Sequence, residues 1–404
     1  MRDLRRRSVA ALLAAVSAIA AASAARPPAA PAQPPRAARE CGDRPGEVPC
    51  RWRNGVYLVS GFAARYDVRD RRGTTLAEAA VDRLVRGDRN GLVVLVVELF
   101  KGRDDVIRYR EGMTANDQNL LDASRRAHRR GAKVAIRLKV ESARGGVGTD
   151  ACRGQFAASY LSHVDHYAEV ASDAHAEWFV VAGGLTKAFE DACDGLWDGY
   201  WHDVLYSASS RLGPRPKVVV SFAADRIRRM LGAGAGAYGW VGREAASGRL
   251  DAIGVAGAFP LTGRPTARVA PMVAGWRAGG RGSPFALVRA LHRTYHRPIL
   301  LDGIGFPRCP GATAEPANAS CSRHARGARR TQSRAVQATY CFWTGWQREH
   351  PQARWFRGLW WWAYDLTVPR YRSPWHVGRR GRARTPAARI AAWNMGRGSR
   401  RSCG

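Results

Sequence analysis

The chain has 404 residues, of which 46% are hydrophobic, a composition that argues against global disorder and allows one large domain or two ordinary ones. Its net charge is +32 at pH 7, and all but five of its 65 basic residues are arginine. A positive field of this size favours anionic partners in a salt-dependent way, although the arginine bias also fits a GC-rich genome.

The first 24 residues have the pattern of a secretory signal peptide. Arginines at positions 2, 5, 6 and 7 precede an apolar run at 9–22, and small residues follow at 22–24. We expect cleavage near Ala24, because the run is short for a retained membrane anchor of about 20 apolar residues. The mature protein is therefore predicted to be secreted or extracytoplasmic, without a transmembrane anchor. Residues 25–50 follow as a Pro/Ala-rich linker that contains Cys41 and Cys50.

Residues 51–366 alternate two kinds of segment. Near-continuous apolar runs are typical of buried parallel strands, and the amphipathic stretches between them have helical spacing. The predicted strands are 56–62, 92–100, 134–140, 178–185, 218–224, 253–259, 299–306 and 359–364. The predicted helices are 75–85, 116–130, 155–174, 196–212, 227–246, 284–295 and 332–349. Eight such repeats predict an α/β fold, a single (β/α)8 TIM barrel.

An open, doubly wound sheet is the competing arrangement. It would need a glycine-rich phosphate-binding loop after an early strand. The glycine-rich segment 232–239 (GAGAGAYG) follows a helical stretch instead, and we interpret it as a flexible loop. The barrel is therefore the preferred fold.

Residues 367–404 are predicted to form an arginine-rich C-terminal extension. From Leu366 to Gly404 there are ten arginines and no acidic residue. Such a tail suits an acidic polymer as partner, either a polysaccharide or a nucleic acid, or a phospholipid surface. A solvated tail without a specific partner is the plainer interpretation, because no nucleic-acid-binding motif accompanies the charge.

The eight cysteines include no CxxC pair, and they fit an oxidised, exported protein better than a zinc site. Sequence alone does not determine their connectivity, and local spacing favours four pairs. These are Cys41–Cys50, Cys152–Cys193, Cys309–Cys321 and Cys341–Cys403. Asn318 begins an N-glycosylation sequon, Asn318-Ala319-Ser320, which would place the loop around it at the surface.

Five segments carry a resemblance to a known family. Their sequences are TANDQNLLDASRRAHRRGAKVAIRLKVE at 114–141, WFVVAGGL at 178–185, DAIGVAGAFPL at 251–261, ILLDGIGF at 299–306 and RGLWWWAYD at 357–365. In order, they are similar to the third strand with its preceding helix, and to the fourth, sixth, seventh and eighth strands, of the beta-mannanase-like glycoside hydrolase family 113 of clan A. The resemblance spans roughly residues 56–364 and implies a TIM barrel that acts on saccharides.

The resemblance also implies where the catalytic groups would stand. Its acid/base position falls at Gly184 and its nucleophile position at Gly303, and the family has glutamate at both. Retaining hydrolysis needs a carboxylic acid and a carboxylate about 5 to 5.5 Å apart, and glycine supplies neither. The sixth strand departs as well, with Ala256 and Ala258 where the family tends to have an acidic residue and a tyrosine. The usual chemistry is therefore predicted to be absent.

Other carboxylates could replace the missing pair. Asp302 adjoins Gly303, but alternation along a continuing strand would turn its side chain to the opposite face. Other acidic residues that close predicted strands are Glu98, Glu141, Asp225 and Asp365. For any one of them we favour an ion pair with a nearby arginine, because catalysis would require two carboxyl groups at the right separation, one with a raised pKa.

Aromatic residues are the second saccharide signal. Trp360, Trp361, Trp362 and Tyr364 crowd the end of the last predicted strand. Flat rings stack on the apolar faces of pyranose rings, so these residues are candidate substrate-binding groups. Because strand residues alternate between faces, only some can face the barrel axis. We favour Trp361 or Trp362 as a saccharide platform.

Other chemistries find less support. Three histidines fall on predicted helices: His163, His166 and His202. We interpret them as packing or surface residues in preference to metal ligands. No GxSxG elbow occurs, and no metal or cofactor is predicted.

Three hypotheses follow, and the enzymatic status stays open among them. The first is a secreted glycosidase-like barrel that has lost hydrolysis and binds an oligo- or polysaccharide. The second is an active glycosidase on a beta-linked polysaccharide that uses displaced carboxylates. The third is a basic structural or coat-associated protein whose extension binds an acidic polymer.

Overall fold

The structure is a computed structural model, and the chain divides into two units, Met1–Gly42 and Asp43–Gly404. The described residues all belong to the second unit: 48–49, 51–59, 66, 68–85, 91–102, 104, 106–142, 155–183, 197–214, 216–232, 235–257, 259–263, 268–309, 311–316, 328–366, 376–378, 385–395 and 403. The predicted signal peptide and the sequon at Asn318 lie outside them.

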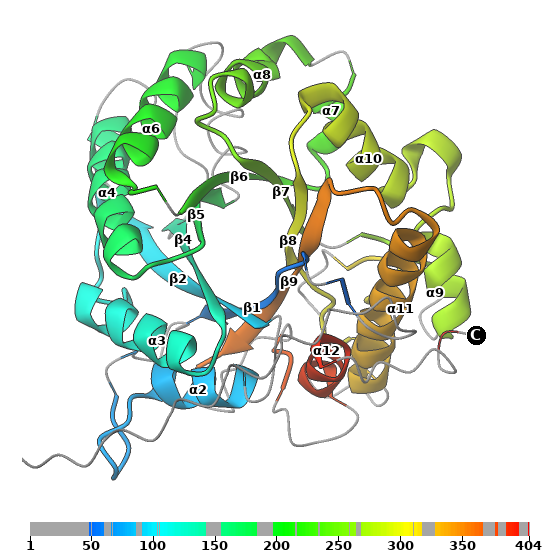
Figure 1. Cartoon of the computed structure of the whole chain (residues 1–404), viewed down its shortest axis with the longest axis horizontal. Coiled ribbons are helices and arrows are strands. Elements are labelled where there is room, and N and C mark those ends of the chain that lie inside the picture. Colours follow the sequence, from blue (N-terminus) through cyan, green and yellow to red (C-terminus); the bar gives the residue numbers. More distant parts are fainter. Residues whose placement is uncertain are drawn as a thin grey trace, which may run out of the picture. The chain divides into compact units, whose positions relative to one another are not determined.

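The second unit is built on a closed parallel barrel of eight strands (Figure 1). Each strand pairs in parallel with its neighbours, and the first pairs with both the second and the last, which closes the sheet. The barrel strands are β1 (Asn54–Val59), β2 (Gly91–Lys101), β4 (Lys133–Ser142), β5 (Trp178–Gly183), β6 (Lys217–Ala223), β7 (Ala252–Gly257), β8 (Ile299–Ile304) and β9 (Phe356–Asp365). All eight predicted strands are confirmed, and so is the TIM-barrel fold. One short strand was not predicted, β3 (Ile107–Arg108), which pairs antiparallel with the end of β2.

Helices surround the barrel (Figure 1). They are α2 (Leu76–Val85), α3 (Asp117–Arg129), α4 (Gln155–Asp173), α6 (Trp197–Arg211), α7 (Ile227–Met230), η2 (Ala235–Tyr238), α8 (Gly239–Ala246), α9 (Val269–Gly275), η3 (Gly280–Gly282), α10 (Pro284–Tyr295), α11 (Ala328–Glu349) and α12 (Pro386–Asn394). Six of the seven predicted helices are confirmed as single helices. The seventh, 227–246, is broken into α7, η2 and α8, because its central glycine-rich run disfavours a continuous helix. Both α9 and α12 were missed.

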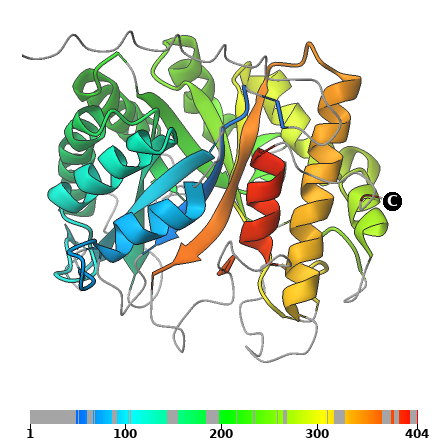
Figure 2. The ribbon, with the colours of Figure 1, turned by 60° about the horizontal axis from the view of Figure 1, so that its bottom comes forward.

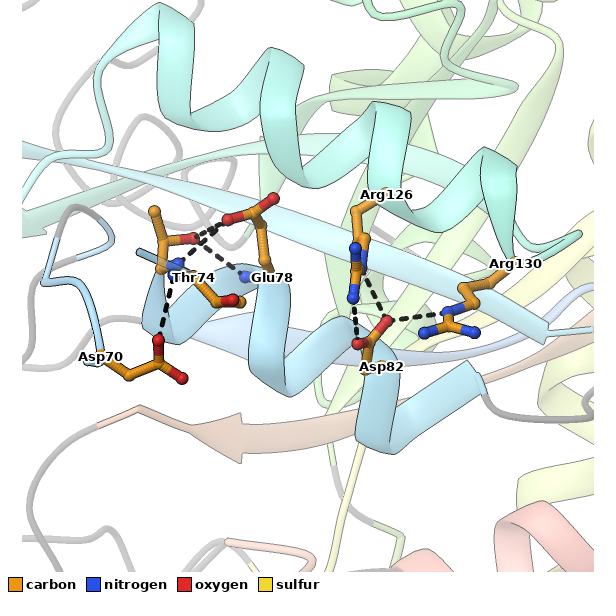
Figure 3. Close-up of polar contacts among 7 residues, drawn as sticks. Asp70, Thr74, Glu78, Asp82, Arg126 and Arg130 are labelled. Carbon is orange, nitrogen blue, oxygen red and sulfur yellow. Dashed lines mark hydrogen bonds and ion pairs between the residues drawn. The ribbon is translucent and has the colours of Figure 1, made fainter. Parts of the chain in front are cut away.

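Local sequence explains how α2 is fixed. Thr75 and Glu78 form a capping box at its start: Glu78 Oε2 accepts from Thr75 N at 2.9 Å, and Thr75 Oγ1 accepts from Glu78 N at 3.1 Å. Farther along, Asp82 accepts from Arg126 of α3 and from Arg130, which follows the last residue of α3, at 2.8 Å and 2.9 Å from their Nε atoms (Figure 3). These ion pairs tie α2 to α3 on the outside of the barrel.

The hydrophobic core has two layers. The outer layer lies between the strands and the helices. The inner layer fills the barrel with side chains from every strand: Tyr57, Val59, Leu92, Val94, Val96, Ala135, Trp178, Val180, Val219, Ala252, Leu300, Trp360 and Ala363. Because strand residues alternate between faces, this set determines which later residues of each strand point toward the barrel axis.

The C-terminal extension packs onto the barrel in its described part. α12 lies beside α11 (Figure 2), where Trp393 stacks on Tyr340 with ring centroids 5.4 Å apart. Arg389 Nε donates to Ser333 Oγ at 2.7 Å, so this arginine serves docking and not an outside partner. The predicted disulfide Cys341–Cys403 is confirmed and holds the end of the extension to α11. This part is therefore a folded element and not a solvated tail.

The other cysteine predictions are less fully described. Cys309 is disulfide-bonded, while Cys41, Cys50, Cys152, Cys193 and Cys321 lie outside the described residues. Among the helices that the structure describes, none combines the length and the apolar character needed to span a membrane.

Candidate functional site

In a TIM barrel the site lies at the carboxyl ends of the strands, so we consider the inward-facing residues there. Continuing the alternation of the inner core along each strand brings Glu98 of β2, Arg137 and Lys139 of β4, Asp302 of β8 and Trp362 of β9 to this end. A largely apolar interior thus gives way to charged groups at the barrel mouth.

Arg137 is the central group of this site. Its Nη1 donates to Asp302 Oδ2 at 2.7 Å and to Tyr57 Oη at 2.5 Å, and its Cζ lies 4.9 Å from the centroid of the Tyr57 ring. Both charged residues are buried, Asp302 completely and Arg137 to within 5% exposure. Burial lowers the pKa of Arg137 to about 10 and raises that of Asp302 well above its usual range. The guanidinium therefore stays cationic at neutral pH.

The arginine side chain fills the space beside the ends of β5 and β8. A Cβ on Gly183 would lie 2.1 Å from Arg137 Nε, and a Cβ on Gly303 would lie 3.5 Å from Arg137 Nη1. Gly184, the predicted acid/base position, lies outside the described residues. At the predicted nucleophile position, Gly303, the chain thus presents an arginine in place of a carboxylate.

Asp302 faces the barrel interior, because alternation along β8 puts it on the same face as Leu300 of the inner core. The register of β8 against β9 shifts between Asp302 and Ile304, and Gly303 adopts a left-handed conformation with φ of 73°. The expectation that Asp302 and position 303 face opposite ways is therefore wrong, since a Cβ on Gly303 would also lie 3.5 Å from Arg137 Nη1. Full burial, however, keeps Asp302 from touching a ligand in the mouth.

A second charged group lies nearby. Lys139 Nζ lies 3.6 Å from Glu98 Oε1 and also contacts Glu141 Oε1. The same ammonium lies 5.0 Å from the centroid of a Trp362 ring. One lysine is therefore shared between the two carboxylates predicted as possible substitutes, and it sits over the aromatic ring that faces the barrel axis.

The two remaining predicted carboxylates lie apart from these groups. Asp225 is exposed in the turn after β6. Asp365 closes β9 and is buried, and its backbone N–H donates to His376 Nδ1 at 3.0 Å. In the sixth barrel strand, Ala256 is half-buried, and Ala258 lies outside the described residues.

The aromatic candidates divide by the face that they occupy. Trp361 is buried and donates from Nε1 to Tyr340 Oη of α11 at 3.1 Å, so it packs outside the barrel. Tyr364 is also buried, and its hydroxyl accepts from Arg83 of α2 at 3.2 Å. Trp362 points inward and contacts Tyr57, with centroids 5.1 Å apart. Trp360 is fully buried in the inner core. Of the four candidates, only Trp362 is placed to meet a ligand in the mouth.

Sequence reasoning missed Tyr57, Arg137 and Lys139. A signal was present, because Val134, Ile136 and Leu138 form an apolar outward face and leave Ala135, Arg137 and Lys139 to point inward. The three histidines that we interpreted as packing or surface residues each contact a protein oxygen. His163 contacts Ile107 O, His166 contacts Asp117 and His202 contacts Glu244. Within the described part of the chain, no group of three or more His, Cys, Asp or Glu residues is arranged to hold a metal ion.

Comparison with known proteins finds similarity to solved structures. No protein-family profile and no curated protein matches the chain. Two solved structures of GH113 beta-1,4-mannanases, one of them a complex, match with TM-scores of 0.59 and 0.58 at 13% and 15% identity, covering 85% of this chain and 98% and 99% of theirs. The GH113 beta-mannanase of Alicyclobacillus acidocaldarius, in complex with ManMIm, matches with a TM-score of 0.56 at 18% identity, over 84% of this chain and 96% of that one. The chain thus shares the glycoside-hydrolase type of TIM barrel.

Proposed function

We propose that this chain is an exported, saccharide-binding barrel of the glycoside-hydrolase type that does not hydrolyse its ligand. The predicted signal peptide at residues 1–24 and the structural likeness to saccharide-cleaving barrels support this proposal. Arg137 is the observation that carries it. Its guanidinium occupies the space in which a nucleophilic carboxylate at position 303, at the end of β8, would contact the sugar. Asp302 and Tyr57 hold it there by accepting hydrogen bonds from Nη1.

Binding would take place on Trp362 and the polar groups around it. The indole offers an apolar face for a pyranose ring, and Lys139 and Glu141, which are partly exposed, offer hydrogen-bonding groups for sugar hydroxyls. Such a mixture of one flat ring and a few convergent polar groups is typical of saccharide recognition. The ligand would be a neutral oligo- or polysaccharide, with the beta-1,4-linked mannans of the similar enzymes as the first class to test.

An active glycosidase with displaced carboxylates is the second candidate, because Glu98 and Glu141 contact one ammonium and therefore lie close together. Their arrangement does not favour catalysis. They stand on the neighbouring strands β2 and β4, on one side of the mouth, whereas hydrolysis needs carboxyl groups that flank the scissile bond. A lysine between them also neutralises the pair.

One experiment tests both functions. The purified protein is titrated calorimetrically with beta-1,4-mannohexaose, cellohexaose and chitohexaose, and the products are analysed after long incubation. We expect binding without turnover, and we expect Trp362→Ala to weaken the binding about tenfold through loss of stacking. Tyr206→Ala is the matched control, because Tyr206 is an exposed aromatic residue of α6, 60% accessible.

Turnover would overturn the proposal if it is lost in Glu98→Gln or Glu141→Gln, since those carboxylates would then be catalytic. Equal affinities of the Trp362→Ala and Tyr206→Ala proteins would remove Trp362 as the platform. Absence of binding to all three oligosaccharides would count against the function as a whole.

A further inference from the structure

Beside the barrel mouth lies a cavity of about 620 Å³, which we name the shoulder notch. It opens between the start of α3, the middle of α4 and the segment that follows β3. Its walls are Tyr66, Tyr109, Arg110, Glu111, Gly112, Thr114, Ala115, Asn116, Asp117, Asn119, His166 and Tyr167. The volume lies within the range of about 300 to 1,000 Å³ that is usual for small-molecule sites.

The walls of the notch are held in place by their own contacts. Asp117 Oδ1 and His166 Nε2, which both line the notch, lie 3.0 Å apart and join α3 to α4. Asn116 caps α3 by accepting from Asn119 N at 2.8 Å. β3 is tied to α4 by Ser159 Oγ, which accepts from Ile107 N at 3.0 Å. The cavity is thus a built feature between fixed elements.

The notch adjoins the barrel mouth through Glu98. Thr114 of the notch donates from Oγ1 to the carbonyl oxygen of Glu98 at 2.6 Å. Burial and the Glu98 carboxylate together raise the pKa of Tyr66, which places this notch residue within electrostatic reach of the same glutamate. An extended ligand lying on Trp362 could therefore continue past Glu98 toward the notch.

The chemistry of the notch fits a neutral sugar. Tyr109 is 57% exposed, and its only ring contact among the described residues is an edge-on one with His163 at 5.1 Å. Around it, carboxylates at Glu111 and Asp117 offset the charge of Arg110, and Asn116 offers an amide. One open aromatic face with charge-balanced polar groups suits a ring that has apolar faces and hydroxyl edges. The two carboxylates make an anionic ligand a poor fit.

We propose that the shoulder notch is a second saccharide subsite, with Tyr109 as its stacking platform. This proposal takes the class of ligand from the proposed function. It adds a second place on the protein where another part of the same oligosaccharide binds. The ligand would therefore contact two aromatic platforms, Trp362 at the mouth and Tyr109 in the notch.

Calorimetric titration with beta-1,4-mannohexaose, cellohexaose and chitohexaose tests the notch. Tyr109→Ala should raise the dissociation constant of the best-bound hexaose about tenfold, the loss expected for one stacked ring. Tyr109→Phe should restore most of the affinity, because it keeps the ring. The matched control is Tyr206→Ala, since Tyr206 is also an exposed tyrosine that contacts a histidine, with ring centroids 6.3 Å apart.

The outcomes separate the two proposals. Unchanged affinity in Tyr109→Ala, together with weakened binding in Trp362→Ala, would overturn the notch and leave the proposed function standing. Weakened binding in Tyr109→Ala alone would keep the notch and remove the mouth platform. If the unmodified protein binds none of the three hexaoses, both proposals are overturned.

Discussion

Two arginine–aspartate groups, one inside the barrel and one on its outside, respond differently to their surroundings. Asp82 accepts from Arg126 and Arg130 between α2 and α3 (Figure 3), and these hydrogen bonds lower its pKa to about 2. Asp302 accepts from Arg137 inside the barrel, and burial raises its pKa. The outer carboxylate keeps partial access to water, whereas the inner one has none.

This difference bears on what each group does. An outer ion pair of this kind adds a modest amount to stability and can be lost without disturbing the fold. A buried pair is costly to form, and well-packed hydrophobic residues in its place are often as stable or more so. Stability alone therefore gives little reason to keep Arg137 and Asp302 in the barrel. Their position at the mouth, beside Gly183 and Gly303, instead agrees with the proposed binding site, in which a fixed guanidinium stands where the resemblance implies a carboxylate.

The largest effect is expected from removing Asp302. Asp302→Ala leaves the Arg137 guanidinium buried without the carboxyl oxygen that accepts from it, and should lower the free energy of unfolding by about 3 to 5 kcal/mol. Urea denaturation followed by circular dichroism measures this loss. Asp302→Asn should cost less, because the amide oxygen still accepts from Arg137 and burial already favours the uncharged carboxyl.

A double replacement, Arg137→Met with Asp302→Leu, serves as the control and should recover most of the stability lost in Asp302→Ala. If Asp302→Ala unfolds at the same urea concentration as the unmodified protein, the contrast between the inner and outer groups is wrong.

Crowding around the inner group gives a second, smaller effect. Gly254 of β7 faces Asp302, and a Cβ there would lie 2.8 Å from Ser221 Oγ and 3.0 Å from Asp302 Cβ. Gly254→Ala should therefore destabilise the protein by about 1 to 3 kcal/mol through overpacking. Gly199→Ala is the matched control, since Gly199 lies in α6 with open space around it, and alanine there should stabilise by about 0.5 to 1 kcal/mol. Equal thermal midpoints for the two variants would show that Asp302 is not tightly enclosed.

The barrel could be predicted from sequence because its strands are apolar runs and most helices have a clear amphipathic period. The inner site was harder to predict. Position 303 turns toward Arg137 together with Asp302 because Gly303 adopts a positive φ and the register of β8 shifts there, and neither feature can be read from residue types. α12 was missed because arginines surround its short apolar pattern. Placing Arg137 against Asp302 required contacts between residues 165 positions apart, which strand alternation alone does not provide.

The smallest effect is expected at the outer group, and it depends on pH. The pKa of Asp82 is near 2 in the folded protein and about 3.8 when unperturbed, so its contribution is present above pH 4 and is lost as the pH falls through 2. Because Arg130 is 43% exposed, solvent screens the interaction, and we expect the ionised Asp82 to contribute about 1 kcal/mol to the free energy of unfolding. Asp82→Asn should lose this amount at pH 6 and converge with the unmodified protein near pH 2, as measured by urea denaturation across this range. Burial acts on Asp302 with the opposite sign, since a raised pKa favours the folded state at low pH. A constant difference between Asp82→Asn and the unmodified protein from pH 6 to pH 2 would show that Asp82 acts by packing and not by charge.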